Sequence, residues 1–200
     1  MAARERSEVR REQIADAALR IIAVEGLGKF TTAAIAKAVG LTDGAIFRHF
    51  DSKEDIVQAA VERVEAVLFA DFPPKHRDPI ERLGLFFRNR VRAVTGLPGV
   101  AHLMFSDQLA QAAGPVGAVK VREMQARTLD FLRACLDEAA AKRRLREDAD
   151  VDDLLVLVRG ALLALLQPDF PGGDAEARQV RADRVWALLK GIMTGRKGGA

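Results

Sequence analysis

The spacing of the apolar residues constrains the fold most, because they recur every three or four positions along almost the whole chain. Ile14, Ala18 and Ile21 share one face of a first helix by this spacing, and Leu188 and Ile192 do so near the end. The chain contains no Tyr, and no stretch alternates apolar and polar residues in the manner of a strand. We therefore predict an all-α protein.

Clusters of glycine and proline interrupt this periodicity and mark the ends of the helices. They divide the chain into about nine expected helices, over residues 8–25, 31–38, 42–49, 52–72, 79–95, 98–110, 115–144, 150–167 and 174–194.

Charge, cysteine content and apolar runs argue against a disulfide-stabilised, secreted or membrane-spanning protein. The 31 basic and 28 acidic residues leave a net charge of only +3, which is weak support for a nucleic-acid partner. The lone cysteine, Cys135, cannot form an intrachain disulfide, as suits a reducing cytoplasm. The first dozen residues lack the apolar stretch of a signal peptide. The longest apolar run, 154–166, is interrupted by Arg159 and is shorter than the roughly 18 residues that would suggest a membrane span. We expect a cytoplasmic protein with no membrane partner.

Residues 32–51 have the spacing of a helix-turn-helix. Small Ala36 is followed four positions later by Gly40, and apolar Ile46 comes six positions after that. The glycine lies where the chain leaves the first helix, a position that often needs a positive φ. Thr42 is a suitable N-cap for the second helix, because its hydroxyl can accept from a free backbone amide.

The outer face of this second helix is suited to DNA. Its first turn carries only small side chains, so the backbone can approach base edges. Its end carries cationic or hydrogen-bonding groups. The residues of this face are Asp43, Gly44, Ala45, Phe47, Arg48 and His49. Asp51 and Glu54 fit a capping box at the start of the next helix, where Lys53 marks a natural seat for a phosphate. Two ordinary packed helices could show the same spacing, but they would not leave such residues outside.

The N-terminal third resembles the DNA-binding domain of TetR-family (tetracycline-repressor-like) transcriptional regulators. The matching residues lie between about 10 and 60 and are Ile14, Ala17, Ala18, Gly26, Thr31, Thr32, Ile35, Ala36, Val39, Gly40, Thr42, Gly44, Ile46, Phe47, His49, Phe50, Lys53 and Glu54. The resemblance implies an all-helical homodimer. It has a three-helix DNA-binding domain over residues 1–52 and an effector-binding and dimerisation domain over residues 53–200.

The resemblance also implies roles for individual residues. Phosphate contacts are expected at Thr32, Phe47, His49 and Lys53, and base readout is expected at Thr42, Asp43, Gly44, Ala45 and Arg48. Phe47 is a departure, since the family usually has Tyr there. The hydroxyl that commonly reaches a phosphate is therefore missing, and with it a hydrogen bond of about 1 kcal/mol.

The helix expected over 150–167 is apolar almost all round, so a second surface must cover it. Together with the last helix it could form a four-helix dimer interface, as in the family. The candidate interface residues are Gly160, Leu162, Leu163, Leu166, Val185, Trp186 and Leu189. Burial within the single chain is the alternative.

Polar groups on the apolar stripes of the middle helices suggest a ligand pocket. Arg90 and Arg127 fall between apolar residues at helical spacing, and unpaired burial would be costly for both. An anionic or carbonyl-bearing apolar ligand would satisfy them, although a structural role is the commoner one for such residues. The candidate pocket residues are Phe86, Phe87, Arg90, His102, Phe105, Met124, Arg127 and Phe131.

No catalytic signature is present. The three histidines and one cysteine lack the spacing of metal ligands, and there is no phosphate-binding loop or nucleophile elbow. We therefore expect no enzyme activity, metal or cofactor. The predicted function is sequence-specific binding to pseudo-palindromic double-stranded DNA by a homodimer, as a repressor released by a small effector. The alternatives are an effector-independent regulator or nucleoid-associated dimer, and an all-α enzyme or scaffold.

Overall fold

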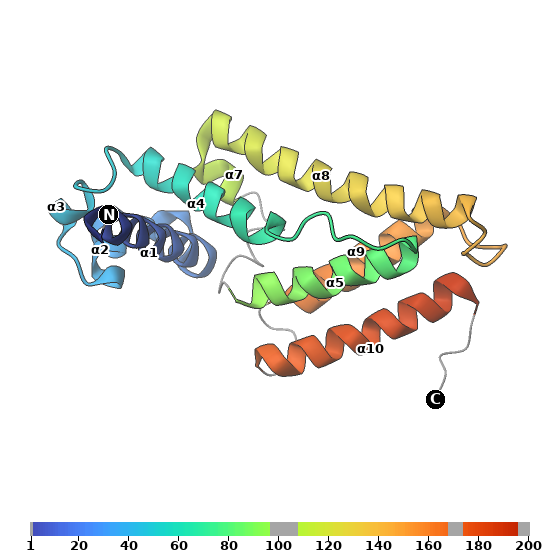
Figure 1. Ribbon diagram of the computed structural model, residues 1–200. Helices are drawn as coiled ribbons and strands as arrows, with labels where there is room; N and C mark the ends of the chain where they lie inside the picture. Colours follow the sequence, from blue (N-terminus) through green and yellow to red (C-terminus); the bar gives the residue numbers. More distant parts are fainter. Residues whose placement is uncertain (1, 97–107, 168–173, 196–200) are drawn as a thin grey trace. The chain divides into compact units, whose positions relative to one another are not determined.

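The computed structural model describes residues 2–96, 108–167 and 174–195 of the chain. Within these ranges it contains nine α-helices, one 3₁₀ helix and no strand (Figure 1). The predicted all-α fold is therefore confirmed. Contacts divide the chain into two compact units. The N-terminal unit is Met1–Val67 with Leu97–Met124, and the C-terminal unit is Leu68–Gly96 with Gln125–Ala200.

Helices of the N-terminal unit are α1 (Ala2–Glu25), η1 (Leu27–Lys29, the 3₁₀ helix), α2 (Thr32–Val39), α3 (Asp43–Ile46), most of α4 (Lys53–Phe69), α7 (Gln108–Ala112) and the first part of α8 (Gly114–Ala141). The C-terminal unit contains α5 (Pro79–Thr95), the rest of α8, α9 (Val151–Leu166) and α10 (Ala175–Thr194).

Most expected helices match the observed ones to within a few residues, and α5 matches the expected range 79–95 at both ends. The second helix of the helix-turn-helix is shorter than expected. Regular α-helix ends at Ile46, and the chain tightens into a turn in which the His49 amide donates to the Ile46 carbonyl at 2.9 Å. Most of the helix expected over 98–110 lies outside the described residues. The 3₁₀ helix η1 was not expected.

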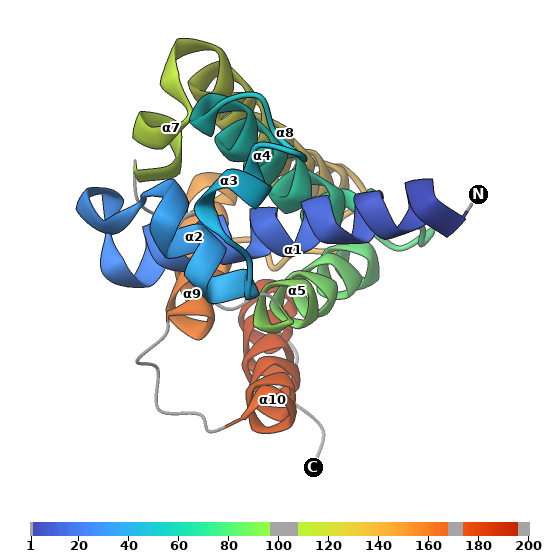
Figure 2. The ribbon, with the colours of Figure 1, turned by 90° about the vertical axis from the view of Figure 1, so that its left-hand side faces the viewer.

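The N-terminal unit is built around α1, against which α2 packs, while α3 packs on α2 (Figure 2). Its buried side chains include Ile14, Leu19, Ile22, Ile35, Ile46 and Ile56. An ion pair at the edge of this core joins α4 to α1, with Nε of Arg63 at 3.1 Å from Oδ1 of Asp16. These contacts give the short helix α3 a rigid support.

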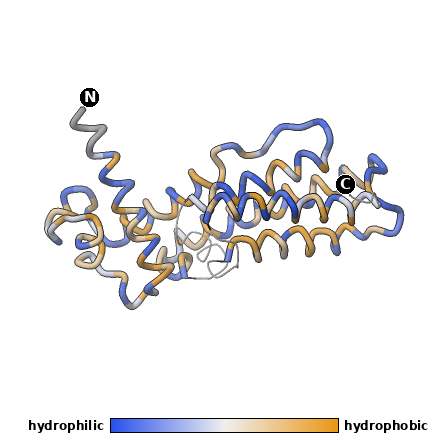
Figure 3. Tube along the Cα trace, turned by 90° about the horizontal axis from the view of Figure 1, so that it is seen from below, coloured by the Kyte–Doolittle hydropathy of each residue, from blue (hydrophilic) through white to orange (hydrophobic). Residues whose placement is uncertain are grey.

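In the C-terminal unit, α5 packs against both α9 and α10. Apolar and polar residues alternate in short stretches along the helices, as one-sided burial requires (Figure 3). Close packing of α5 on α10 depends on Gly84, since a Cβ there would overlap the indole ring of Trp186. That indole is 4% exposed, and its centroid lies 5.6 Å from the ring centroid of Phe87.

Candidate DNA-binding face and ligand-binding groups

The turn between α2 and α3 is formed as the sequence predicted. Gly40 ends α2 in the left-handed region, with φ 68° and ψ 34°, a conformation that an L-residue with a side chain adopts only at a cost. The next amide, of Leu41, donates to the Ala36 carbonyl at 2.9 Å. Thr31, and not Thr32, caps α2, accepting from the Ala34 amide at 3.1 Å.

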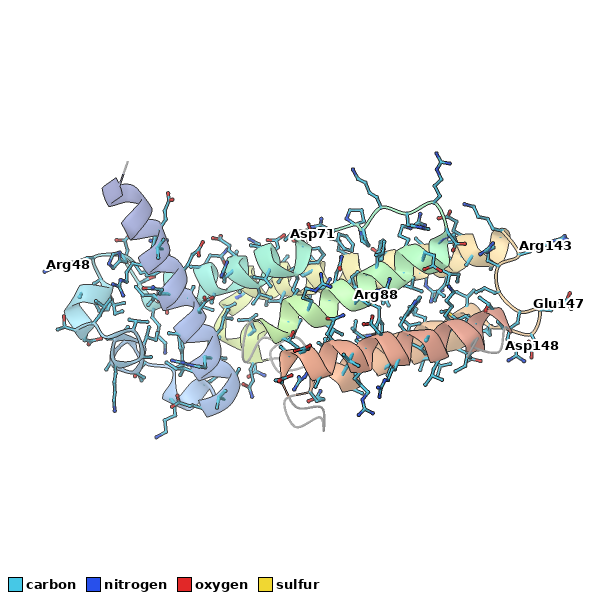
Figure 4. All side chains as sticks on the ribbon, turned by 60° about the horizontal axis from the view of Figure 1, so that its bottom comes forward. Arg48, Asp71, Arg88, Arg143, Glu147 and Asp148 are labelled. Carbon is cyan, nitrogen blue, oxygen red and sulfur yellow. The ribbon has the colours of Figure 1, made fainter. Side chains whose placement is uncertain are left out.

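The outer face of α3 is open. Thr42, Asp43 and Gly44 are exposed, whereas Ile46 is fully buried and anchors the helix. A Cβ built on Gly44 would meet nothing within 4 Å. Arg48 is exposed and points away from the unit (Figure 4). This arrangement offers backbone and small side chains at one end and a long hydrogen-bond donor at the other.

Thr42 occupies the N-cap position of α3, but its hydroxyl makes no cap hydrogen bond, so the expected acceptor role is wrong. The hydroxyl thus remains available to an outside partner. Ala45 is half-buried behind the exposed residues. The phenyl ring of Phe47 is 49% exposed.

Arg11 on α1 supports the turn that follows α3, a role that the sequence did not reveal. Its guanidinium donates to the His49 carbonyl and lies 4.1 Å from the ring centroid of Phe50. The imidazole of His49 is half-buried, and its Nδ1 has no hydrogen-bond partner. The backbone of this turn is therefore tied to α1 while α3 itself stays uncovered.

The cap of α4 is one residue later than expected. Ser52, and not Asp51, accepts from the Asp55 amide at 3.1 Å and donates to the Asp55 carboxylate at 2.8 Å. The predicted box of Asp51 and Glu54 is wrong, because the neighbouring pair has the same spacing and supplies the observed bonds. Lys53 is exposed, with Nζ 4.5 Å from the ring centroid of Phe30. It thus lies at the N-terminus of a helix, where an anion is stabilised.

In the C-terminal unit, Arg90 is buried to 2% exposure and has no carboxylate partner among the described residues. Its Nη2 lies 3.5 Å from the Thr128 hydroxyl, and its Nη1 has no hydrogen-bond partner. Burial lowers the pKa of Arg90 to about 10, since desolvation penalises the charged form.

Arg90 lies beside two rings, those of Phe69 and Phe86, which belong to a linked group of four aromatic residues. The sequence analysis missed two of the four. Phe69 and Phe72 lie at and just beyond the end of α4 and join the predicted Phe86 and Phe131. We call these four residues the aromatic cluster. The signal that could have found the first two is their three-residue spacing in front of the proline pair.

The other predicted pocket residues divide into three groups. Arg127 lies on the aromatic cluster, 4.3 Å from the ring centroid of Phe69, but is itself exposed. Phe87 packs instead on Trp186, and Met124 is buried in the N-terminal unit. His102 and Phe105 lie outside the described residues.

A cavity of about 680 Å³ borders the aromatic cluster at Phe131 and lies beside the segment that precedes α5. Its lining is Pro73, Pro74, Lys75, His76, Arg77, Arg82, Phe131, Ala134 and Cys135. The Arg82 guanidinium is held in place by Glu138 and by Cys135, whose Sγ is 3.5 Å from Nε. Burial raises the pKa of the Cys135 thiol, although Arg82 opposes this.

The helices α9 and α10 expose an apolar face, but it is not the one that was predicted. Four predicted interface residues are buried within the single chain, namely Leu162, Leu166, Trp186 and Leu189. Gly160 is exposed, and Leu163 and Val185 are half-buried. Val180 on α10 remains outside at 46%, as do four further large apolar side chains on these two helices, Val156 (69%), Leu157 (45%), Leu188 (69%) and Ile192 (47%). We call these four residues the apolar face.

Two further findings concern the described part of the chain. No helix in it is long and apolar enough to cross a membrane. No group of three or more His, Cys, Asp or Glu side chains in the same residues could hold a metal ion.

Comparison with known proteins places the N-terminal unit in context. Residues 14–60 match the family model described as bacterial regulatory proteins, tetR family. Over 193 residues the chain is 27% identical to the HTH-type transcriptional regulator SrpR of Pseudomonas putida, covering 92% of this chain and 87% of the relative. It is also 27% identical over 202 residues to the nucleoid occlusion factor SlmA of Vibrio atlanticus (strain LGP32), covering 92% and 95%.

Solved structures share the fold. The ketosteroid transcriptional regulator KstR2 of Mycobacterium tuberculosis superimposes with a TM-score of 0.70 at 24% identity, covering 92% of this chain and 95% of that one. The TetR-family regulator PfmR of Thermus thermophilus gives 0.70 at 22% identity, covering 88% and 95%.

Proposed function

Because this chain belongs to the TetR family of DNA-binding transcriptional regulators, we propose that it binds a pseudo-palindromic operator as a homodimer and that a small effector releases it. In this proposal residues 1–52 bind DNA, and residues 53–200 bind the effector and the second subunit. The observation that carries the DNA-binding part is the open face of α3. There Thr42, Gly44 and Arg48 are exposed on a helix whose other side is locked into the core.

Each element of this face has a role in the proposal. The guanidinium of Arg48 is suited to a base edge in the major groove, and the bare Gly44 lets the backbone approach closely. The free hydroxyl of Thr42 can bond to a base or a phosphate. Thr32, His49 and Lys53 contact phosphates, and the phenyl ring of Phe47 contacts the sugar-phosphate backbone without a hydrogen bond.

Selection from a random pool of double-stranded DNA tests the proposal. We expect one enriched pseudo-palindromic sequence, with half-sites about one helical turn apart. Arg48→Ala should weaken binding to that sequence by about 1–3 kcal/mol and relax selectivity at one base pair. Arg92→Ala, which removes an exposed arginine from the C-terminal unit, is the matched control and should have little effect. Equal affinity of the native protein for selected and random DNA would contradict sequence-specific regulation.

The homodimer part rests on the apolar face. Four large apolar side chains on two neighbouring helices are exposed to water, which is unfavourable. A second copy of the same face would bury them. Leu188→Glu should split the dimer and lower operator affinity, as measured by sedimentation and DNA titration. Val116→Glu is the control, since Val116 is 80% exposed on α8 and is not part of this face. A native protein that sediments as a monomer at micromolar concentration would refute the assembly.

Similarity to SlmA supports a second candidate, a nucleoid-associated dimer that needs no effector. The two candidates differ in where the protein binds on the chromosome. A regulator should occupy a few promoters, whereas a nucleoid-associated protein should occupy many sites spread along the DNA. Mapping the occupied sites in cells therefore separates them.

A further inference from the structure

The aromatic cluster forms a continuous apolar surface in the C-terminal unit. The ring centroids of Phe69 and Phe72 are 5.0 Å apart, Phe72 and Phe131 are 5.0 Å apart, and Phe131 and Phe86 are 5.1 Å apart. Three different segments, α4 with its following loop, α5 and α8, thus contribute to one patch of rings.

Arg90 lies against this surface with its Nη1 group lacking a hydrogen-bond partner. Its guanidinium carbon is 4.9 Å from the ring centroid of Phe86 and 5.2 Å from that of Phe69. Rings attract a cation but cannot accept the directed hydrogen bonds of five N–H groups. The only described acceptor is the distant Thr128 hydroxyl, and Nη1 has none at all. Buried charges in proteins are ordinarily paired, so this arrangement needs an acceptor.

A second guanidinium flanks the same rings from the solvent side. Arg127 lies 4.3 Å from the centroid of Phe69 and 5.1 Å from that of Phe72, and it forms no ion pair within the described ranges. One ring, Phe69, is therefore shared between a buried cation and an exposed one. Two positive charges thus lie beside apolar rings, and no described carboxylate lies between them. Such a site favours binding of an anion that has an apolar part.

We propose that the aromatic cluster binds an apolar carboxylate, that Arg90 Nη1 takes the carboxylate group, and that Arg127 closes over the bound molecule. A carboxylate is the fitting acceptor because its two oxygens match the planar guanidinium fork. The inference deepens the proposed effector response and rests on it. Binding is measured without DNA, so a failure here is distinguishable from a failure of DNA recognition.

The test is a panel of matched ligands on the full chain. Straight-chain carboxylates of four to twelve carbons and phenylalkanoates are each compared with their primary amides, by thermal shift and titration calorimetry. We expect at least one carboxylate to bind about tenfold or more tightly than its amide, since bonds to a charged group are stronger than neutral ones. If every carboxylate in the panel binds no more tightly than its amide, the proposal is overturned.

Variants locate the binding group. Arg90→Met should remove the preference for carboxylate over amide while leaving the amide affinity nearly unchanged. Arg88→Met is the matched control, because Arg88 lies two positions earlier on α5 and its Nε is 3.9 Å from Asp183 instead (Figure 4). It should retain the preference. Should Arg90→Met not fold, Arg90→Lys keeps the charge without the fork and should lower the preference partly.

The cationic rim of the neighbouring cavity is the competing location. If the carboxylate binds there, Lys75→Met or Arg77→Met should abolish the preference while Arg90→Met leaves it intact. That result would refute the assignment to Arg90. Loss of preference in Arg90→Met alone, with both rim variants unchanged, would support it.

Discussion

Replacing Arg90 by methionine should stabilise the protein in the absence of ligand. Methionine is shorter than arginine but is as flexible and matches its aliphatic stem, so it can fill much of the space without burying a charge. A buried arginine is ordinarily expected to hold a fold together, but no carboxylate among the described residues compensates this one. Replacing a paired arginine lowers the free energy of unfolding, whereas replacing Arg90 should raise it.

The magnitude follows from the lowered pKa. A pKa of about 10, in place of the ordinary value for arginine, corresponds to a cost of about 3 kcal/mol for keeping the group charged at neutral pH. The two ring contacts return about 1–2 kcal/mol. Arg90→Met should thus raise the free energy of unfolding by about 1–2 kcal/mol, or the melting temperature by roughly 2–8 °C for a chain of this size.

The pH dependence gives an independent check. Because the folded state lowers the pKa of a basic group, it binds fewer protons than the unfolded state above about pH 10, and native stability rises with pH there. The difference in free energy of unfolding between Arg90→Met and the native protein should be largest at pH 8 and should shrink above about pH 10.

Urea unfolding followed by the fluorescence of Trp186 measures the difference, at equal protein concentration because a dimer's stability depends on it. Arg82→Met is the control, since Arg82 pairs with Glu138 and its loss should destabilise. A decrease of 1 kcal/mol or more in the free energy of unfolding of Arg90→Met would refute the view that the Arg90 charge is uncompensated.

Three further predictions concern packing, capping and reactivity. Ser52→Ala should lower the free energy of unfolding by about 1 kcal/mol in urea titrations, whereas Asp51→Ala should leave it nearly unchanged, and equal effects would contradict the observed cap. Gly84→Ala should cost about 1–3 kcal/mol, because its Cβ must displace a buried indole, and an unchanged melting temperature would show that α5 and α10 separate easily. Cys135 should react slowly with iodoacetamide at pH 8 until the protein unfolds, because the thiol is 1% exposed and burial raises its pKa. Rapid alkylation of the native protein would mean that the thiol is accessible.

Local signals made some elements predictable. The start of α5 is marked in the sequence by Pro79. The structure adds that Asp78 is the N-cap, with its carboxylate accepting from the Ile80 amide at 2.8 Å. The cap of α4 was misplaced because Asp51 and Ser52 are both suitable caps, each with an acid three positions later. Spacing alone cannot choose between two such overlapping pairs.

Other features depend on packing between distant segments. A helix that is apolar all round, such as α9, does not show in its sequence which side faces the core. Leu162 was therefore expected at the interface, although it is buried, while Val156 was not. The position of Phe69 beside Arg90, and of Phe72 beside Phe86, likewise depends on how α4 and its loop meet α5. No periodicity within one segment contains that information.

The open space over Gly44 has a consequence for how such a protein can change. A Cβ at this position meets no neighbour within 4 Å, and Thr42, Asp43 and Arg48 are exposed as well. Substitutions there add atoms on the side that we propose faces the DNA groove, without disturbing the core that holds α3 in place. Selectivity for a new DNA sequence can therefore be acquired one side chain at a time, in nature or by engineering, while the scaffold beneath stays unchanged.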